Sequence, residues 1–301
     1  MNLPLLFALL CCTGLGATSF NKLCSNIVVG FSGARYMMFF TVNGIVACIF
    51  FLFSGNFNVE LNLPTFIYAL LFAAVVAGSL VVSLFLLKLA TITGVKILAG
   101  GFGLVATSAT GFLLFNENVS PSTVIRIVIM LCAMACIFIE DRKSNKTDGK
   151  KSDIRNTVYL IAALTCSALL GCFATVITKF FAEATNVTGE NSFFFWTNVI
   201  LIAFSIPVFA VLCLRKKGTF ADSVSLLRPR KLISLAGNTV CSNINSLVTV
   251  WILAQTELSV YTPISSALGI LTSVVASLLF RERLGVFSYV AAAVACIAVI
   301  I

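Results

Sequence analysis

One face of the predicted helix 91–115 carries a lysine followed by small residues, which together could bind a polar solute. Intervals of four, three, four and four residues keep these side chains on one side of a helix: Lys96, Gly100, Gly103, Thr107 and Gly111. An ammonium group attracts a carboxylate or a phosphate, and glycines let a solute reach the backbone. Close packing of two membrane helices requires the same kind of stripe, so both interpretations stay open.

Lys96 is the most informative single residue of this face, because it is a cation inside a predicted helix. It is about five residues inside the helix, or roughly 7–8 Å at about 1.5 Å per residue. A charge near the centre of a bilayer costs roughly 2.5–3.5 kcal/mol. Lys96 therefore either faces a cavity and binds solute or extends to the lipid headgroups. Lys22 and Lys179 are nearer to helix ends, and we expect both to extend to the headgroups.

Amide and hydroxyl side chains supply further candidate contacts. The predicted helix 232–255 has a polar face that consists of Asn238, Ser242, Asn245 and Thr249. Asparagine both donates and accepts hydrogen bonds, so it suits either a solute or a neighbouring helix. The candidate substrate-binding residues are Lys96, Gly100, Gly103, Thr107, Tyr261, Ser265, Asn245, Asn43 and Asn198.

The composition places this chain in lipid. Of its 301 residues, 59% are hydrophobic and 10% are charged, whereas a soluble domain carries about 25% charged residues. About 20 apolar residues span a bilayer as a helix, and runs of that length favour helices over the alternating strands of a barrel. We predict an all-α integral membrane protein with ten transmembrane helices: 3–21, 34–54, 64–89, 91–115, 120–139, 157–182, 191–214, 232–255, 258–280 and 285–301.

Several kinds of site are disfavoured by residue types that are absent or unsuitably placed. Histidine is absent, which removes the commonest metal ligand and the usual base near neutral pH. All eleven acidic residues fall in loops or at helix ends. No carboxylate is therefore expected in mid-membrane for catalysis or for proton-coupled export of cations. We predict no enzyme activity, no catalytic residues, no cofactor and no metal site.

The chain contains an internal repeat. Residues 91–117 align without gaps to residues 256–282 at an offset of 165, and the motif Leu-Leu-Phe-x-Glu stands in both. In this alignment Tyr261 and Ser265 correspond to Lys96 and Gly100. Two weaker matches follow the same order, at offsets of 157 and 155: Gly14 and Lys22 with Gly171 and Lys179, and Phe39, Phe40 and Asn43 with Phe194, Phe195 and Asn198.

This repeat predicts two halves of opposite orientation. The unit contains five spans, and because five is odd the second copy enters the membrane upside down relative to the first. Inverted repeats are typical of secondary transporters. We expect residues 1–139 to form the first five-helix repeat, residues 140–156 a basic cytoplasmic linker, and residues 157–301 the second repeat.

Three segments carry a resemblance to a known family. They are GLGATSFNK at 14–22, LLFNE at 113–117 and ALGILTSVVASLLFRERL at 267–284. In these segments, and in its number of spans, the chain resembles the drug/metabolite transporter superfamily in its ten-helix, EamA-like form. The resemblance implies a permease that moves small metabolites, often amino acids or sugars, through a central cavity between the halves.

The basic residues predict the orientation in the membrane. In the ten-span topology, 18 of the 20 Lys and Arg residues lie on one side, and only Arg126 and Lys179 lie on the other. Cytoplasmic loops carry the basic excess, so loops 140–156 and 215–231 are predicted to be cytoplasmic and both termini to lie outside. Permeases of the family usually place both termini in the cytoplasm. The net charge of +9 indicates contact with anionic lipid rather than with nucleic acid.

These patterns together predict a secondary transporter that moves a small polar metabolite, amino-acid-like or anionic, by alternating access. Its partners are a small-molecule substrate and the lipid bilayer of the plasma or inner cell membrane, and it is a monomer or a homodimer. A sugar permease of the same superfamily is the alternative. A non-transporting scaffold or sensor would need a partner-binding segment, and only residues 140–156 are available for one.

Labelling of a cysteine introduced at Ser144 tests the predicted orientation. A membrane-impermeant thiol reagent should leave the Ser144→Cys side chain unmodified in intact cells and modify it after the membrane is opened. Reaction in intact cells would place loop 140–156 outside and reverse the assignment.

Overall fold

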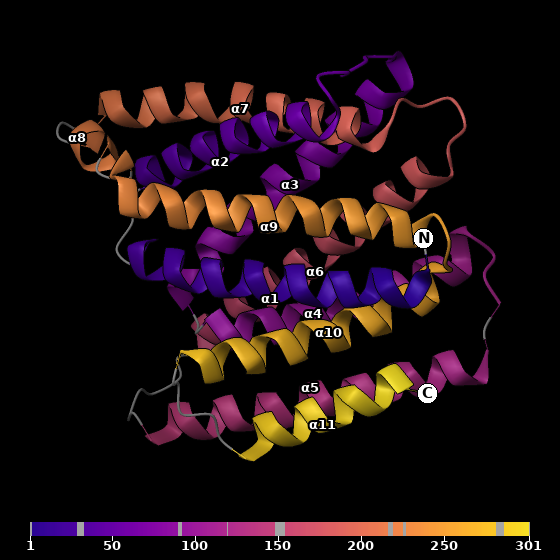
Figure 1. Cartoon of the computed structure of the whole chain (residues 1–301). Helices are drawn as coiled ribbons and strands as arrows, with labels where there is room; N and C mark the ends of the chain where they lie inside the picture. The colour runs from indigo at the N-terminus through magenta and orange to yellow at the C-terminus, as the bar shows by residue number, and fades with distance from the viewer. Residues whose placement is uncertain are drawn as a thin grey trace. The chain divides into compact units, whose positions relative to one another are not determined.

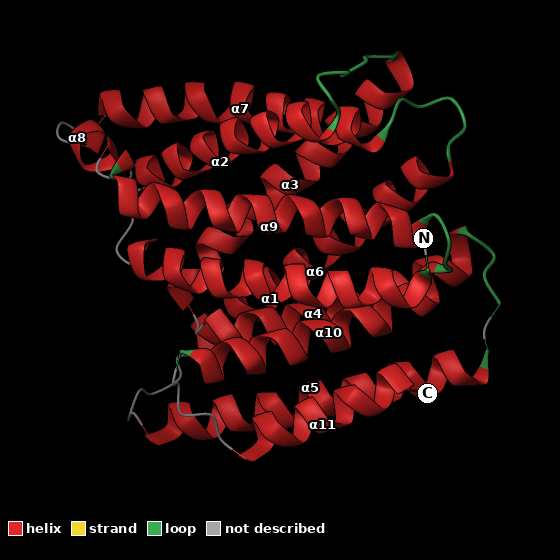
Figure 2. Ribbon diagram, viewed as in Figure 1, coloured by secondary structure: helices red, strands yellow, loops and turns green. Residues whose placement is uncertain are grey.

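Helices joined by loops make up the described part of the chain. The computed structural model describes residues 2–28, 33–89, 92–118, 120–147, 154–215, 219–224, 227–280 and 286–300 (Figures 1 and 2). The helices are α1 (Leu3–Val28), α2 (Gly33–Ser54), α3 (Leu63–Leu89), α4 (Ile92–Leu114), α5 (Pro121–Thr147), α6 (Ile154–Glu183), α7 (Glu190–Arg215), α8 (Thr219–Val224), α9 (Pro229–Leu253), α10 (Leu258–Leu279) and α11 (Val286–Ile300). The prediction of an all-α fold is confirmed, because ten of these helices follow the ten predicted spans in order.

Two elements differ from the sequence-based expectation. α5 continues to Thr147, so the first part of the predicted linker 140–156 is helical. Residues such as Glu140 and Lys143 have high helix propensity, which allows the helix to continue beyond its apolar part. α8 is a short helix within the predicted loop 215–231, and six residues are too few to show a periodic pattern in the sequence.

The helices form two compact units. Unit 1 contains residues 1–74 and 183–251, and unit 2 contains residues 75–182 and 252–301. Unit 1 therefore holds α1, α2, the start of α3, α7, α8 and nearly all of α9. Unit 2 holds the rest of α3, the last two residues of α9, and α4, α5, α6, α10 and α11. Each unit combines helices from both predicted repeats.

In unit 1, α2 and α7 pack antiparallel along most of their length. The hydroxyl oxygens of Thr41 and Ser205 are 2.9 Å apart. Further along α2, the rings of Phe51 and Phe194 stack with centroids 5.3 Å apart. At the end of α2, Ser54 donates a hydrogen bond to Asn191 at 3.0 Å. Residue numbers rise along α2 while they fall along α7, so two helices that correspond in the repeat pack against each other in opposite directions.

α1 and α9 form a second antiparallel pair in unit 1. Thr13 donates a hydrogen bond to Asn245 over 3.1 Å. A Cβ added at Gly16 would lie 2.9 Å from the sulfur of Cys241, and one added at Gly237 would lie 2.7 Å from the ring of Phe20. Glycines on both helices therefore allow close approach, which is how helices associate in lipid.

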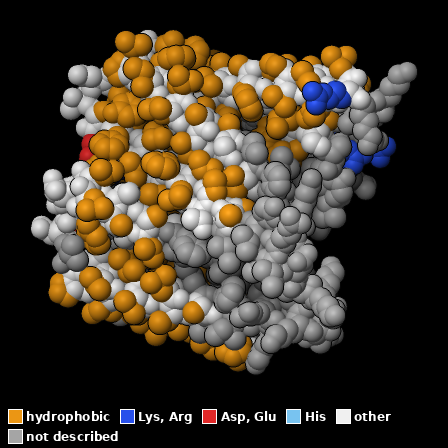
Figure 3. Space-filling model, turned by 180° about the vertical axis from the view of Figure 1, so that it is seen from behind, with side chains coloured by type: hydrophobic (Ala, Val, Ile, Leu, Met, Phe, Trp, Pro, Cys, Tyr) orange, Lys and Arg blue, Asp and Glu red, His pale blue; other side chains and the backbone are white. Residues whose placement is uncertain are grey.

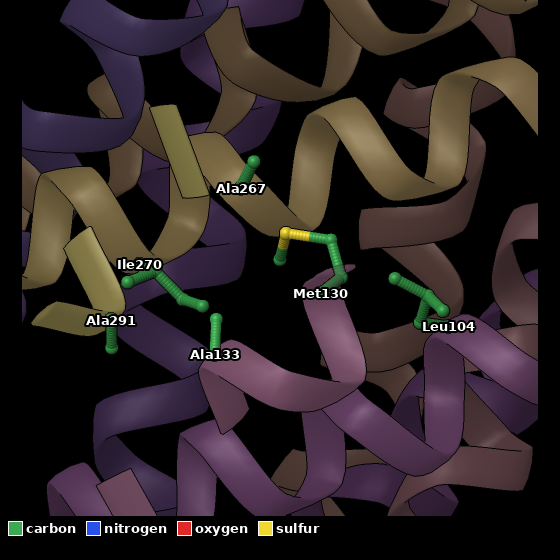
Figure 4. Close-up of a cluster of buried hydrophobic side chains, with 6 residues drawn as sticks. All are labelled: Leu104, Met130, Ala133, Ala267, Ile270 and Ala291. Atoms are coloured by element: carbon green, nitrogen blue, oxygen red, sulfur yellow. The ribbon is translucent and has the colours of Figure 1, made fainter. Parts of the chain in front are cut away.

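The core of unit 2 lies between α4, α5, α10 and α11. Figure 4 shows its buried side chains, three of which are alanines, and they are Leu104, Met130, Ala133, Ala267, Ile270 and Ala291. Leu104 lies near the middle of α4, and Ala267 lies near the middle of α10. Towards the end of α4, a Cβ added at Gly111 would lie 3.3 Å from the backbone nitrogen of Ser259, at the start of α10. α4 and α10, which correspond in the repeat, thus also pack antiparallel.

α6 completes unit 2 and contacts both α4 and α3. It runs parallel to α4, since Thr110 contacts Cys172 at 3.7 Å and the rings of Phe115 and Phe180 lie 4.7 Å apart. It also contacts α3, where a Cβ added at Gly78 would meet Leu170 at 3.4 Å. A chain that crosses the membrane alternately produces this pattern, with parallel packing of the fourth and sixth spans and antiparallel packing of the three pairs described above.

The surface and the lengths of the helices are those of a multi-pass membrane protein. Among the described residues, five helical segments are long and apolar enough to cross a membrane, and three further segments are apolar but shorter. Large hydrophobic side chains are widely exposed, for example Leu113 at 78% and Leu214 at 86%. On the face shown in Figure 3, hydrophobic side chains cover much of the described surface, and Lys and Arg side chains lie at one edge.

Substitution of Gly44 tests the close packing of α2 on α7. A Cβ added at Gly44 would lie 2.6 Å from Cγ1 of Ile202, so Gly44→Ala should destabilise the protein by about 1–3 kcal/mol through overpacking. Gly171 provides the control, because an added Cβ there meets no atom within 4 Å. Gly171→Ala should leave stability unchanged or raise it by up to about 1 kcal/mol. Thermal unfolding in detergent measures both, and equal unfolding temperatures would contradict the packing argument.

Candidate functional site

The nine candidate substrate-binding residues are divided between the two units. Unit 1 contains three of them, on α2, α7 and α9, and they are Asn43, Asn198 and Asn245. Unit 2 contains the other six, on α4 and α10, and they are Lys96, Gly100, Gly103, Thr107, Tyr261 and Ser265. The surroundings of Lys96 and Gly100, and the side chain of Lys22, lie outside the described part of the structure.

In unit 1, two asparagines join neighbouring helices. Asn43 of α2 accepts a hydrogen bond from the hydroxyl of Thr239 on α9, and Asn245 of α9 accepts one from Thr13 on α1. Both asparagines are half-buried. A side-chain amide has two donor positions and two acceptor positions, and within the described residues each of these amides uses only one of the four. The remaining positions can bind a polar solute.

Asn198 is placed differently from the other two asparagines. Its amide nitrogen donates to the carbonyl of Phe194 in its own helix at 2.8 Å. The repeat therefore aligns Asn43 with a residue that bonds within one helix rather than across two. Asn198 still lies at the packed face of α7, because its carbonyl oxygen would be 3.7 Å from a Cβ added at Gly44.

The sequence did not point to the hydroxyl partners of these amides. Thr13 and Thr239 are buried, and each also bonds to a carbonyl one turn earlier in its helix, that of Leu9 or of Leu235. Threonines that bond to their own helix are common in membrane helices. The one signal in the sequence is that Thr239 directly follows Asn238, which belongs to the polar face of the predicted helix 232–255.

In unit 2, the candidate residues with described side chains are buried or hydrogen-bonded to their own helices. Thr107 is 3% exposed and donates to the carbonyl of Gly103 at 2.7 Å. Ser265 donates to the carbonyl of Thr262 at 3.0 Å, and Tyr261 is buried. Gly103 faces α6, but an added Cβ would lie 3.9 Å from the carbonyl oxygen of Ala168, an ordinary contact distance that does not require glycine.

A carboxylate binds the start of α10. Glu117, in the loop after α4, accepts hydrogen bonds from the backbone N–H groups of Leu258 at 2.5 Å and Ser259 at 2.7 Å. The first N–H groups of a helix have no partner within the helix, and a negative charge is favourable at that end of the helix dipole. A carboxylate in this loop could also form an ion pair or cap the following helix, α5. Instead, Glu117 caps α10. Glu117 follows α4, and α10 is the helix that corresponds to α4 in the repeat.

Gly111 makes room for this carboxylate. A Cβ added at Gly111 would lie 2.5 Å from a carboxylate oxygen of Glu117 and 3.3 Å from the backbone nitrogen of Ser259. Any larger residue would separate Glu117 from the N–H groups that it binds. The glycine at position 111 of the α4 stripe is therefore explained by helix packing and by the cap on α10.

A lysine binds the end of α9, next to the same turn. The ammonium group of Lys179 donates to the carbonyls of Leu253 at 2.8 Å and Thr256 at 2.7 Å, and the side chain is 6% exposed. A cation suits the negative end of the helix dipole. The prediction that Lys179 extends to the headgroups is wrong, because carbonyls at the end of α9 provide partners inside the protein.

Glu117 and Lys179 together form what we call the turn clamp, in which they hold the turn between α9 and α10. The carboxylate binds the N–H groups after the turn and the ammonium binds carbonyls before and within it. Both contacts lie within unit 2. Opposite charges thus hold opposite helix ends, and each charge is satisfied by backbone groups.

Comparison with known proteins gives a fold but no family. No protein-family model matches the chain, and no curated protein matches it. Solved structures do resemble it, and 28 of their chains match. One of these, a crystal structure, superposes with a TM-score of 0.65 at 14% identity, over 97% of this chain and 94% of that chain. At this identity the likeness concerns the fold alone, and it extends over nearly the whole chain.

Neutralising Glu117 tests the turn clamp. Glu117→Gln leaves one side-chain oxygen for two N–H groups, so we expect a loss of about 1–3 kcal/mol of stability and faster amide exchange at residues 258–261. Glu60→Gln is the matched control, since Glu60 is an exposed carboxylate in the loop between α2 and α3. Thermal unfolding and hydrogen exchange by mass spectrometry compare the two variants. Unchanged exchange at the start of α10 in Glu117→Gln would contradict this role.

Proposed function

We propose that the chain is a secondary transporter, a permease that moves a small polar metabolite, amino-acid-like or anionic, by alternating access. The observation that carries the proposal is the antiparallel packing of helices that correspond in the repeat. α2 meets α7 and α4 meets α10, and each pair meets near the middle of both helices. Helices related by an inverted repeat run in opposite directions, so a local twofold axis can pass between the two members of each pair.

A second pair of contacts supports the inverted repeat. Gly16 on α1 packs against Cys241 on α9. The repeat predicts an equivalent of each position. Gly16 plus 157 residues gives Phe173 on α6, and Cys241 minus 165 residues gives Val76 on α3. α6 and α3 are in contact close to those positions, through Leu170 and Gly78. One helix contact thus occurs twice in the chain, as two copies of one module require, and inverted modules let a transporter adopt two conformations of similar energy.

The polar groups between the helices suit a small polar solute. Asn43, Asn245, Thr13 and Thr239 place amides and hydroxyls between helices of unit 1. Polar groups inside membrane proteins are costly unless they are satisfied, and they commonly mark solute pathways. Together with the sequence resemblance, these features support membership of the drug/metabolite transporter superfamily in its EamA-like form, and a location in the plasma or inner membrane.

Counterflow into liposomes tests transport directly. Purified protein in liposomes loaded with unlabelled solute should accumulate the same labelled solute from a panel of amino acids, sugars and organic phosphates. Accumulation of sugars alone would favour a sugar permease. Accumulation of none would favour a non-transporting scaffold.

Lys96→Met tests whether the substrate is charged. If Lys96 binds a carboxylate or a phosphate, the variant should lose most counterflow of the anionic or zwitterionic solute at normal expression. Lys151→Met removes the same charge from the predicted linker and should keep counterflow unchanged. Equal counterflow in the two variants would contradict a role of Lys96 in binding.

A further inference from the structure

The segment between α7 and α9 combines basic residues with exposed apolar side chains, and the proposed transport does not use either. Residues 215–231 contain six basic residues and one acidic residue, which are Arg215, Lys216, Lys217, Arg228, Arg230, Lys231 and Asp222. Arg215 and Arg228 are exposed. A cluster of four to eight basic residues beside a membrane helix attracts anionic lipid.

The short helix α8 is attached to unit 1 and exposes apolar side chains. It packs on α2 and α7, and its Ser223 is completely buried. Phe220 is 61% exposed, and Val224, one turn later, is 38% exposed. Residues four apart share one side of a helix, so these two side chains form a single apolar patch. The ring of Phe220 also lies 6.3 Å from that of Phe209 on α7, which restricts its position.

The exposed arginines flank this apolar patch in the chain. Arg215 ends α7 and Arg228 immediately precedes α9, so both lie at helix ends on the same side of the alternating topology. Figure 3 shows Lys and Arg side chains at one edge of a largely hydrophobic surface. At the boundary between headgroups and acyl chains, an apolar side chain can enter the acyl region while a nearby cation stays among the headgroups.

We propose that α8 and the flanking arginines bind an anionic phospholipid. Phe220 and Val224 contact the acyl chains, and the guanidinium groups of Arg215 and Arg228 bind the lipid phosphate, for which their planar donors are well suited. This site lies within unit 1 and does not depend on the proposed transport function.

Native mass spectrometry of the purified full-length protein tests the site. Delipidated protein is titrated with phosphatidylglycerol and with phosphatidylcholine that carry the same acyl chains. The wild-type protein should bind phosphatidylglycerol several-fold more tightly. Equal affinity for the two lipids overturns the proposal without the need for any variant.

A pair of double variants distinguishes this site from general attraction by the basic side. Arg215→Gln with Arg228→Gln should lower the affinity for phosphatidylglycerol about five- to twenty-five-fold, at roughly fivefold per basic residue near an anionic surface. Lys150→Gln with Lys151→Gln removes the same charge from the predicted linker and should change affinity less than twofold. An equal loss in both double variants overturns a site at α8. Size-exclusion elution and thermal unfolding confirm that each protein is folded.

The acyl chains and a soluble competitor distinguish a lipid from a free phosphate compound. Phe220→Ser should weaken binding of long-chain phosphatidylglycerol several-fold, because it removes an apolar contact. Glycerol phosphate at millimolar concentration should not displace the lipid. Displacement by glycerol phosphate, together with unchanged lipid binding by Phe220→Ser, would point to a soluble phosphate compound and overturn the proposal.

Discussion

Helices in lipid associate only where their backbones come close, because lipid tails are as apolar as the side chains and no hydrophobic effect drives the contact. In unit 1 this approach depends on glycine. Gly44 of α2 has no side chain and leaves space for Ile202 of α7. Gly16 of α1 leaves space for Cys241 of α9 in the same way. The polar contacts lie next to these glycines: Thr41 with Ser205 is one turn from Gly44, and Thr13 with Asn245 is one turn from Gly16. Short hydroxyl and amide side chains meet there because the helices are already close.

The two charged side chains of the turn clamp, Glu117 and Lys179, also make short contacts, and their partners are backbone groups. The N–H groups at the start of α10 and the carbonyls at the end of α9 have no partners within their own helices. The negative carboxylate of Glu117 accepts hydrogen bonds from these N–H groups, and the positive ammonium group of Lys179 donates to these carbonyls. A buried charge is tolerable when its hydrogen bonds are complete. This arrangement explains how Lys179 can be almost fully buried although it carries a charge.

The sequence was sufficient to predict the helices, which depend on composition. It was not sufficient to predict side-chain positions that depend on single contacts. Long apolar runs were sufficient to predict the ten long helices. The length of α5 was underestimated because hydropathy falls at Glu140 although helix propensity does not. Lys179 was placed at the headgroups because distance from a helix end does not reveal which carbonyls lie opposite.

The candidate site was predictable in part for the same reason. Asn43 and Asn245 stand out in apolar runs, and both lie at contacts between helices. Their partners Thr13 and Thr239 do not stand out, because hydroxyls that bond to their own helix are common in membrane proteins. The alternatives for Gly111 could be separated only by the position of Glu117, which depends on a helix about 140 residues later in the chain.

That separation in the chain bears on the order of biosynthesis. Glu117 and Lys179 are synthesised before the backbone groups of residues 253–259 that they bind. A nascent chain that has reached only α9 holds a carboxylate and an ammonium group whose backbone ligands at the α9–α10 turn are still missing. Synthesis of the turn and of the start of α10 supplies the carbonyl of Thr256 for Lys179 and the N–H groups for Glu117.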